Sequence, residues 1–460
     1  MQNKDNKDSS TNTANTQCLY GKETVKALEN FTISKLKMPR AFLWALGTIK
    51  SACAQANQEL ALLDEDKSAA IKLAAQKVAD GCFDEQFPID VFQTGSGTST
   101  NMNANEVIAS LAEQNKDNTL PIHPNDDVNM GQSSNDIIPS CIHLSAAVLI
   151  AKQLLPALQQ LIEMLDNKAS EHQHTIKTGR THLMDAMPLS FAQEISGWSA
   201  QVRYVHDQLQ QSLPSLCKLA IGGTAVGTGV NTHPKFAAKV SHVLTEKTGL
   251  AFTPADNYFR AISAQDTAVF ISGILKTTAV SLSKISNDIR WLSSGPLNGL
   301  NEIQLPERQK GSSIMPGKVN PVVPEAILMA CTQVIGNDTT ITLAGQSGNF
   351  QLNTMLPLIA HTLIQSIELL SSSSISLTEK VIKDIVVNQS VIEQSLAKNP
   401  ILVTALAQRI GYEKSAEIAK TAYIENRTVI DVAKALTQLS EAELLELLDP
   451  KNLISNQSSK

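Results

Sequence analysis

The segment 307–321, which contains the run GSSIMPGKVNP, concentrates side chains that could bind a small anion. Lys318 offers a positive charge and Asn320 offers an amide. Ser312 and Ser313 add hydroxyls, so the segment holds the donors that a dicarboxylate needs. Two glycines and two prolines within the run exclude regular structure and predict a mobile loop that ends where a helix begins. Such a loop could close as a lid, although its composition fits a solvated surface loop equally well.

Four further polar, glycine-rich segments occur elsewhere in the chain, at 93–105, 123–135, 179–185 and 222–233. They are too polar to form a core and too far apart in sequence to make one local site. If they carry function, long elements must bring them together, within one chain or between chains.

Amphipathic helices are the elements that the sequence offers for this task. Apolar residues recur at alternating steps of four and three along several stretches, which is the spacing of one helix face. These positions are Ile271, Leu275, Leu282, Ile285, Ile289 and Leu292, with Thr278 in the gap, and then Leu154, Leu158, Leu161 and Leu165. Gly295 and Pro296 end the first of these helices. A third helix is predicted over about 326–343.

The same spacing continues from Leu363 to Leu377 across a serine run at 371–374, which we interpret as helix surface rather than linker. After about residue 390 the helical units are shorter, including Pro400–Ile410 and 414–424 on either side of Gly411, as in a small C-terminal domain. Alternating strand patterns of useful length are absent and aromatic residues make up only 4%. The predicted fold class is all-α.

Composition narrows the function further. The 460 residues allow two or three domains, and a net charge of -6 without a basic block argues against a nucleic-acid partner. The most apolar stretch, 146–155, contains Lys152 and is far shorter than the roughly 20 residues needed to span a bilayer, so no membrane span is predicted.

The ends and the cysteines indicate a reducing compartment. Residues 1–17 lack both Arg and an apolar core, and we expect a disordered polar tail rather than a targeting signal. The cysteines are scattered, with no CxxC pair and no His at zinc spacing: Cys18, Cys53, Cys82, Cys141, Cys217 and Cys331. A reduced cytoplasmic thiol set without a metal or other cofactor is the simplest interpretation.

Six motifs in order resemble the class II fumarases of the fumarase/aspartase superfamily. They are QTGSGTSTNMNANE at 93–106, HPNDDVNMGQSSND at 123–136, GRTHLMDAMPLSFAQEISGW at 179–198, GGTAVGTGVNTHP at 222–234, GSSIMPGKVNP at 311–321 and SGNFQLN at 347–353. The similarity extends from about Tyr20 to past residue 430, so it covers nearly the whole chain.

The resemblance implies an N-terminal helical domain at 18–135, a central bundle of five long helices at 136–390 and a small C-terminal helical domain at 391–460. It also implies a homotetramer whose central helices form one twenty-helix core. Each active site would then be assembled from loops of three chains, which would explain why the polar segments are dispersed.

The activity implied is the reversible hydration of fumarate to (S)-malate through an aci-carboxylate intermediate, a step of the tricarboxylic acid cycle. By motif match, Ser312 would remove the C3 proton of malate, and backbone amides or a cation would have to stabilise its alkoxide. His182, paired with Glu325, would activate water. Lys318 and Asn320 would hold the charge that develops on the substrate.

Further residues match the family's binding positions. The substrate carboxylates would be held by Ser96, Thr98, Ser133, Ser134, Asn135 and Thr181, together with Lys318 and Asn320. His123, Asn125 and Asp126 match a second anion site outside the catalytic pocket. Some relatives carry an Arg where this chain has Leu120, and the missing cation weakens that second prediction.

Two alternatives remain open within the superfamily. An aspartate ammonia-lyase would make the same fumarate, and VNPVVPE and VIGND resemble aspartases as much as fumarases. Ser96 and His182 favour the hydratase, because aspartases tend to carry alanine and glutamine there. A non-catalytic structural member, as in lens proteins, is disfavoured because Ser312, Lys318 and Glu325 are all retained.

Overall fold

The computed structural model describes residues 18–114 and 121–454, so the predicted N-terminal tail lies outside the described residues. The chain divides into two compact units, each assembled from several segments. Of the described residues, unit 1 comprises 18–114, 121–148, 214–269 and 340–364, and unit 2 comprises 149–213, 270–339 and 365–454. The predicted division into three domains stays a prediction, although helices begin at Ser134 and Gln389, close to two of its boundaries.

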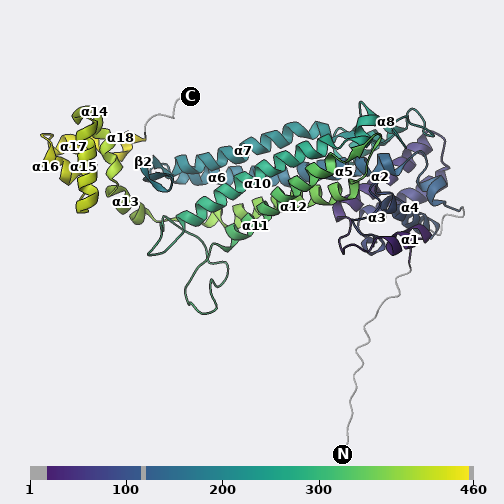
Figure 1. Ribbon diagram of the computed structural model, residues 1–460. Helices are drawn as coiled ribbons and strands as arrows, with labels where there is room; N and C mark the ends of the chain where they lie inside the picture. Colours follow the sequence, from purple (N-terminus) through teal and green to yellow (C-terminus); the bar gives the residue numbers. More distant parts are fainter. Residues whose placement is uncertain (1–17, 115–120, 455–460) are drawn as a thin grey trace, which may run out of the picture. The chain divides into compact units, whose positions relative to one another are not determined.

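Unit 1 is built mainly from medium-length helices. In chain order its elements are α1 (Lys22–Asn30), α2 (Arg40–Glu59), α3 (Glu65–Ala79), a 3₁₀ turn (Asp84–Gln86), α4 (Thr98–Glu113), a π turn (Pro124–Val128), α5 (Ser134–Leu149), β3 (Lys218–Leu219), α8 (Phe236–Thr248), β4 (Thr253–Pro254), α9 (Tyr258–Ser263), β6 (Gly348–Asn349) and β7 (Leu352–Asn353). Helix α2 packs on α3 and α8, and α3 packs on α4 (Figure 1). A Cβ at Gly47 would lie 2.7 Å from the Ala75 carbonyl oxygen, so glycine permits the close approach of α2 and α3.

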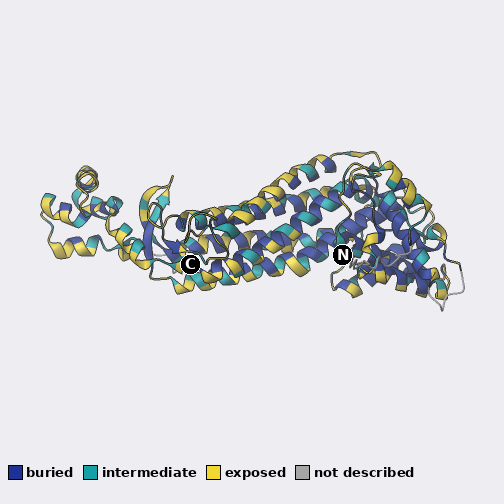
Figure 2. Cartoon of the chain, turned by 90° about the horizontal axis from the view of Figure 1, so that it is seen from below, coloured by how far each residue is buried: buried dark blue, intermediate teal, exposed yellow. Residues whose placement is uncertain are grey.

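Unit 2 contains most of the residues of a bundle of long helices, four of which have one end in unit 1. The helices of the bundle are α6 (Leu155–Glu171), continued from a π turn (Ile150–Leu154), α7 (Phe191–Leu216), α10 (Asp266–Leu292), α11 (Val322–Gly345) and α12 (Leu356–Lys380). Polar contacts join neighbours in the bundle: Trp198 of α7 donates to Asp288 of α10 at 2.9 Å, and Ser272 of α10 donates to Asp338 of α11 at 2.8 Å. The inward faces of these helices are buried (Figure 2).

The remaining elements of unit 2 lie between these helices or after them in the chain. They are β1 (Ile176–Thr181), β2 (Met184–Ser190), β5 (Ile303–Gln304), a 3₁₀ turn (Ile382–Asp384), β8 (Val386–Val387), α13 (Gln389–Ala397), a 3₁₀ helix (Pro400–Leu406), α14 (Ala407–Ile410), α15 (Tyr412–Glu425), α16 (Val429–Leu436), α17 (Glu441–Leu447) and α18 (Pro450–Leu453). Leu406, Ile418 and Leu444 are centres of a small apolar core in the C-terminal part.

The predicted helices are confirmed with small shifts. Every residue of the two predicted stripes is buried, including Thr278. Helix α10 ends at Leu292, just before Gly295 and Pro296, and α11 contains the predicted segment 326–343. Gly411 separates α14 from α15 as expected.

The serine run at 371–374 lies within α12, but its interpretation as helix surface was wrong for three residues. Ser371, Ser373 and Ser374 are buried. The hydroxyls of Ser371 and Ser374 donate to the carbonyls of Ile367 and Leu370 at 2.7 and 2.8 Å, which satisfies them inside the bundle. Because these serine side chains are small and two of the hydroxyls bond within the helix, they can be buried in the bundle. Their polarity alone had suggested exposure to solvent.

The expectation that useful strands are absent also needs correction. Strands β1 and β2 form an antiparallel hairpin, and three further two-stranded sheets occur among the described residues. Thr181 pairs with Met184 across a two-residue turn, and both turn residues, His182 and Leu183, have positive φ (57° and 61°). That geometry is a primed hairpin turn, usually marked by Asn-Gly, so His-Leu gave no signal.

Two helical runs are long and apolar enough to cross a membrane, Ser134–Glu171 and Asp266–Leu292. The sequence prediction considered only the stretch 146–155 and missed that the first run extends on both sides. Of their most apolar windows, 67% and 50% are buried inside the protein. Core helices of a bundle have the same length and composition, so these runs are weak evidence for a membrane.

Candidate active site

The start of α4 carries the first pair of predicted ligands. Ser96 Oγ and Thr98 Oγ1 lie 2.7 Å apart and share a hydrogen bond. Gly97 caps the helix with φ +73°, a left-handed conformation that favours glycine. At Gly95 a Cβ would lie 1.8 Å from the Thr354 carbonyl oxygen, so the loop is pressed against the end of the SGNFQLN segment.

The start of α5 carries the second group. Ser133 precedes the helix, and its hydroxyl oxygen accepts a 3.2 Å hydrogen bond from the backbone N–H of Asn135. Ser134 begins the helix and is buried. Asn135 donates from Nδ2 to the Ala225 carbonyl at 2.7 Å. The backbone N–H groups of Asn135, Asp136 and Ile137 already donate to Ser133, so an anion at this end of α5 would be favoured by the helix dipole and by the hydroxyls.

Helices α4 and α5 meet at these starts. Asn101 of α4 donates from Nδ2 to Ser134 Oγ at 3.1 Å. A Cβ at Gly97 would lie 2.8 Å from Ile138 Cγ1. Unit 1 therefore brings together the two predicted hydroxyl clusters, parts of the polar segments 93–105, 123–135 and 222–233, and the end of the SGNFQLN motif.

Asp136 organises this corner of unit 1. Its carboxylate is fully buried and accepts 2.9 Å hydrogen bonds from the backbone N–H groups of Ser133, Gly222 and Thr224. Burial raises the pKa of Asp136 to about 6, and the three N–H donors and the charge of Lys50 oppose that rise. The carboxylate thus joins the 222–233 segment to the start of α5.

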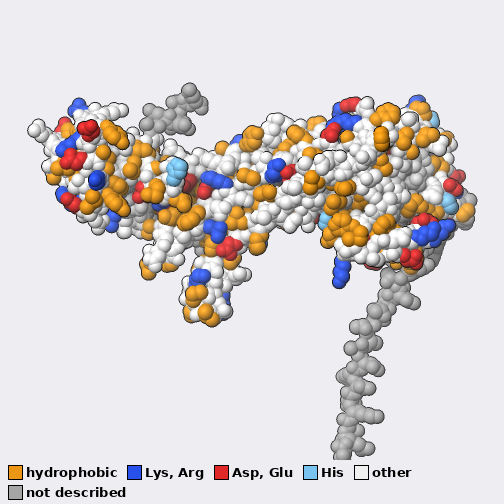
Figure 3. Space-filling view, viewed as in Figure 1, with side chains coloured by type: hydrophobic (Ala, Val, Ile, Leu, Met, Phe, Trp, Pro, Cys, Tyr) orange, Lys and Arg blue, Asp and Glu red, His pale blue; other side chains and the backbone are white. Residues whose placement is uncertain are grey.

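The predicted catalytic loop belongs to unit 2. Ser312 Oγ accepts hydrogen bonds from the backbone N–H groups of Ile314 and Met315 at 3.2 and 3.1 Å. Asn320 closes the base of the loop by donating to the Gly311 carbonyl at 2.6 Å. The loop projects and has exposed hydrophobic side chains at its tip (Figure 3), where Ile314 is 83% exposed.

A cavity of about 640 Å³ lies beside the end of this loop. It is lined by Lys318, Asn320 and Glu325 from the predicted site, and by Arg290, Ser294 and Asn301 among others. Ser312 is not among its lining residues. Within the described chain neither Lys318 nor Arg290 forms an ion pair, so two cations in this cavity are available to an anionic ligand.

Arg290 is a candidate that sequence reasoning missed. Its Nε is buried and has no hydrogen-bond partner among the described residues, while an Nη donates to Asn287 at 2.9 Å. The residue lies in the last turn of α10, where a basic side chain is ordinarily explained by the helix dipole. Only its place beside Lys318 distinguishes it.

Thr181 and His182 lie at the tip of the β1–β2 hairpin and are exposed. The base of that hairpin is fixed by charge: Glu302 is buried and forms ion pairs with Lys177 and Arg180, both at 2.6 Å. Lys177 also pairs with Glu194 at 2.7 Å. These buried ion pairs fix the base of the hairpin that carries the His182 imidazole at its tip.

The predicted pair of His182 and Glu325 is not formed within one chain. His182 takes part in no hydrogen bond or ion pair among the described residues, and Glu325 lies at the start of α11, exposed to the cavity. The pair therefore stays a prediction, and it needs the imidazole and the carboxylate to come from different chains.

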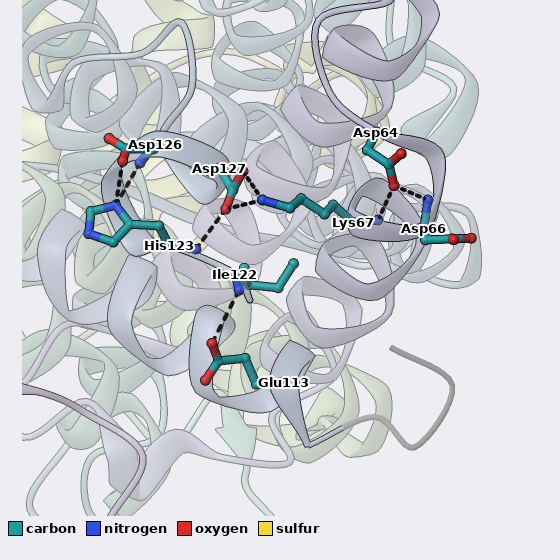
Figure 4. A network of polar contacts seen from close by, with 8 residues as sticks. All are labelled: Asp64, Asp66, Lys67, Glu113, Ile122, His123, Asp126 and Asp127. Atoms are coloured by element: carbon teal, nitrogen blue, oxygen red, sulfur yellow. Dashed lines mark hydrogen bonds and ion pairs between the residues drawn. The ribbon is translucent and has the colours of Figure 1, made fainter. Parts of the chain in front are cut away.

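Figure 4 shows His123 and Asp126 of the predicted second anion site within a network of polar contacts. His123 Nδ1 accepts from the Asp126 amide at 3.1 Å and lies 3.2 Å from its carboxylate. Lys67 contacts both oxygens of Asp127 at 2.9 and 3.0 Å. The nearby cation is thus already neutralised, and Asn125 is exposed beside two carboxylates. Leu120, where the sequence lacks the cation, lies outside the described residues.

Metal ligands do not gather in the described part of the chain: it holds no group of three or more His, Cys, Asp or Glu side chains able to bind a metal ion. All six cysteines are free thiols. The expectation of a metal-free enzyme remains a prediction.

Comparison with known proteins places these motifs. A lyase family model matches residues 11–336, and a model of the fumarase C C-terminus matches 402–455. A class II fumarate hydratase of Pseudomonas aeruginosa is 54% identical over 435 residues, which cover 95% of this chain and 94% of that protein. The chain belongs to the class II fumarase family.

Solved structures in and near the class II fumarase family agree. The class II fumarase of Schistosoma mansoni matches with a TM-score of 0.92 and 39% identity, covering 95% of this chain and 96% of that one. A fumarate lyase:delta crystallin of Brucella melitensis matches with a TM-score of 0.90 and 40% identity over 95% and 96% of the two chains. The predicted fumarase/aspartase-like fold is confirmed.

Proposed function

We propose that the protein is a fumarate hydratase, which adds water reversibly across the double bond of fumarate to give (S)-malate. Membership of the class II fumarase family and relatives that are named fumarate hydratases support this activity. Unit 1 supplies hydroxyl and amide donors for a carboxylate of the substrate, and unit 2 supplies Lys318 and Asn320 for the charge that develops during the reaction.

Hydration needs a base for water and an acid for the neighbouring carbon. In the proposed mechanism His182 takes a proton from water, and the hydroxide forms a bond to C2 of fumarate. The electron pair of the double bond moves onto C3 and into the adjacent carboxylate, giving a dianionic aci-carboxylate. Ser312 then donates its proton to C3, and in dehydration the same steps run in reverse.

The roles of the remaining residues follow from charge. Lys318 and Asn320 stabilise the aci-carboxylate, because preorganised donors lower the energy of charge that appears only during the reaction. Arg290, which lines the same cavity, adds a second cation. Ser96, Thr98, Ser133, Ser134, Asn135 and Thr181 bind the substrate carboxylates, and Glu325 orients the imidazole.

One observation carries the proposal most directly: Ser312 Oγ accepts two backbone N–H hydrogen bonds. Donors aimed at a hydroxyl oxygen favour its deprotonated form, which is what a serine base requires. The same loop carries Lys318 and Asn320. The proposed base and the donors for the developing charge are therefore close together in the sequence.

The assembly is part of the proposal. A homotetramer in which three chains supply each active site would bring the donors of unit 1 to the cavity of unit 2 of other chains. Exposed apolar side chains along α10 and α11 support association: Phe270, Val280, Trp291 and Met329 are each at least 53% exposed. Free cysteines support a reducing, cytoplasmic location.

The deciding experiment is an absorbance assay in the fumarate band with malate and aspartate side by side. The proposal expects fumarate from malate and none from aspartate. Fumarate from aspartate alone would identify an ammonia-lyase, and no turnover of either would favour a structural member of the superfamily.

A further inference from the structure

Lys50 is a buried cation that the proposed mechanism does not use. It lies in the middle of α2 with 0% of its surface exposed, and among the described residues it has no carboxylate at ion-pair distance. The titratable groups that face it are Cys53 on its own helix and Cys141 and Asp136 on α5. Burial lowers the pKa of Lys50 to about 8, so the amine is still mainly an ammonium at neutral pH.

The ammonium makes two hydrogen bonds, both to side-chain amides. Nζ donates to Asn129 Oδ1 at 2.9 Å and to Gln132 Oε1 at 2.8 Å. An ammonium has donors only, so both amides must turn their oxygen atoms toward Lys50. Burying a positive charge without a carboxylate partner lowers the stability of the folded protein. A buried lysine without such a partner therefore invites a functional explanation.

The orientation of Asn129 is passed on to the substrate-binding segment. Asn129 Oδ1 also accepts from Asn101 Nδ2 at 3.1 Å, and the same Nδ2 group donates to Ser134 Oγ at 3.1 Å. With its amino group facing Ser134, Asn101 makes the serine oxygen an acceptor. The hydroxyl proton of Ser134 then has no acceptor among the described residues and is free to be donated elsewhere.

We propose that Lys50 is a positioning residue that holds the hydroxyl of Ser134 in the orientation that donates to a substrate carboxylate. The effect passes through Asn129 and Asn101. The inference rests on the proposed role of Ser134 in binding fumarate and malate.

The direction of these hydrogen bonds matters because an amide can flip. Without the ammonium, only the 3.2 Å hydrogen bond from Asn129 Nδ2 to the Gln132 carbonyl would hold this orientation. If Asn129 turned its Nδ2 group toward Asn101, then Asn101 would present Oδ1 to Ser134. Ser134 would donate inward, and only its lone pairs would face the substrate carboxylate. A hydrogen bond to the substrate would be replaced by repulsion between oxygens.

A double-mutant cycle tests this chain of contacts. Lys50→Met, which keeps the length of the side chain and removes its donors, should raise KM for fumarate about tenfold with a smaller change in kcat, as should Ser134→Ala. In the Ser134→Ala background, Lys50→Met should raise KM by less than about twofold, because the hydroxyl that it orients is gone.

Lys247→Met is the matched control. This exposed lysine of unit 1 contacts Ser51 and Gln76, and among the described residues it has no hydrogen-bonded path to Ser134, so KM should stay unchanged. If Lys50→Met unfolds the protein, Asn129→Leu interrupts the same path with the lysine in place. It should raise KM to the same extent, and again only when Ser134 is present.

Three results would overturn the inference. An unchanged KM in both Lys50→Met and Asn129→Leu would remove the orienting role while leaving the hydratase intact. Equal effects of Lys50→Met with and without Ser134 would mean that the lysine acts on general stability. An unchanged KM in Ser134→Ala would exclude Ser134 from binding, and the role of Lys50 with it, even if malate is still converted.

Discussion

A serine hydroxyl loses its proton far above neutral pH, so its surroundings decide whether Ser312 can act as a base. The backbone N–H groups of Ile314 and Met315 point at its oxygen. Lys318 lies six residues further on and lines the cavity. These features favour an alkoxide at a position that the sequence predicts only by motif.

Removal of this hydroxyl gives the sharpest test at the residue scale. Ser312→Ala should lower kcat for malate dehydration by about a thousandfold or more, because the proposed mechanism assigns exchange of the C3 proton to this hydroxyl. The oligomeric state should not change. Gln309→Ala on the same loop should have near-normal turnover. A near-normal kcat in Ser312→Ala would exclude the serine from proton transfer.

Asp136 gives a pH dependence of stability. Burial raises its pKa from 3.8 to about 6 in the folded chain. Because the folded form binds this proton more tightly, the stabilisation is fully present below about pH 4 and is lost as the pH rises through about 6. The free energy of unfolding of the wild type minus that of Asp136→Asn should therefore fall by about 2 kcal/mol from pH 4 to 7. Denaturant titrations at several pH values would measure it, and a constant difference would contradict the pKa.

Residues such as Lys50, Asp136 and Arg290 could not be selected from the sequence. The type of each side chain was visible, but its importance depends on distant partners. The backbone N–H groups of Gly222 and Thr224 lie 86 and 88 residues from Asp136 in the chain, and Arg290 lines a cavity whose wall is built by separate segments. A lysine within the apolar run of α2 was the one local signal. Motif similarity located the loop residues instead.

At the scale of elements, periodicity was a good guide wherever a helix buries one continuous stripe. It placed α6, α10, α11 and α12 because their apolar faces pack in the bundle. It failed for the serines of α12, whose hydroxyls bond to the preceding turn, and for the β1–β2 hairpin, which is fixed by charge rather than by an apolar face. Periodicity does not report either kind of stabilisation.

Glu302 tests whether charge fixes that hairpin. Glu302→Gln should leave Arg180 without its carboxylate and weaken the hold on Lys177, which lowers the free energy of unfolding by about 3 kcal/mol. Turnover should fall as well, because the hairpin carries His182. Glu417→Gln removes an exposed pair with Lys414 in the same unit and should change stability by less than about 0.5 kcal/mol. Equal effects of the two substitutions would show that the buried cluster does not anchor the hairpin.

At the scale of the whole molecule, the predicted site residues fall into two groups, one in each unit of the described chain. Hydroxyls and helix N-termini gather in unit 1, while the cations, the loop serine and the imidazole belong to unit 2. A single sequence contains the motifs of both groups. If the two groups in one active site come from different chains, that site forms only when the chains assemble. The number of chains therefore rests on the family and on exposed apolar faces of the bundle.

The absence of a metal requirement is a prediction for the assembled enzyme. Extended dialysis against EDTA and exposure to air should leave malate turnover unchanged, because the described residues hold no cluster of metal ligands and the proposed steps use side chains alone. Loss of activity that added metal restores would contradict this part of the account.

The central claim is that each active site combines unit 1 of one chain with unit 2 of another. The direct measurement is the activity of hybrids formed by refolding together two inactive variants, Ser133→Ala with Ser134→Ala in unit 1, and Lys318→Ala in unit 2. If sites are shared between chains, about a quarter of the sites in a random mixture receive two intact halves, and malate turnover should recover to that level. If turnover in the mixture stays at the level of the separate variants, the shared site is wrong.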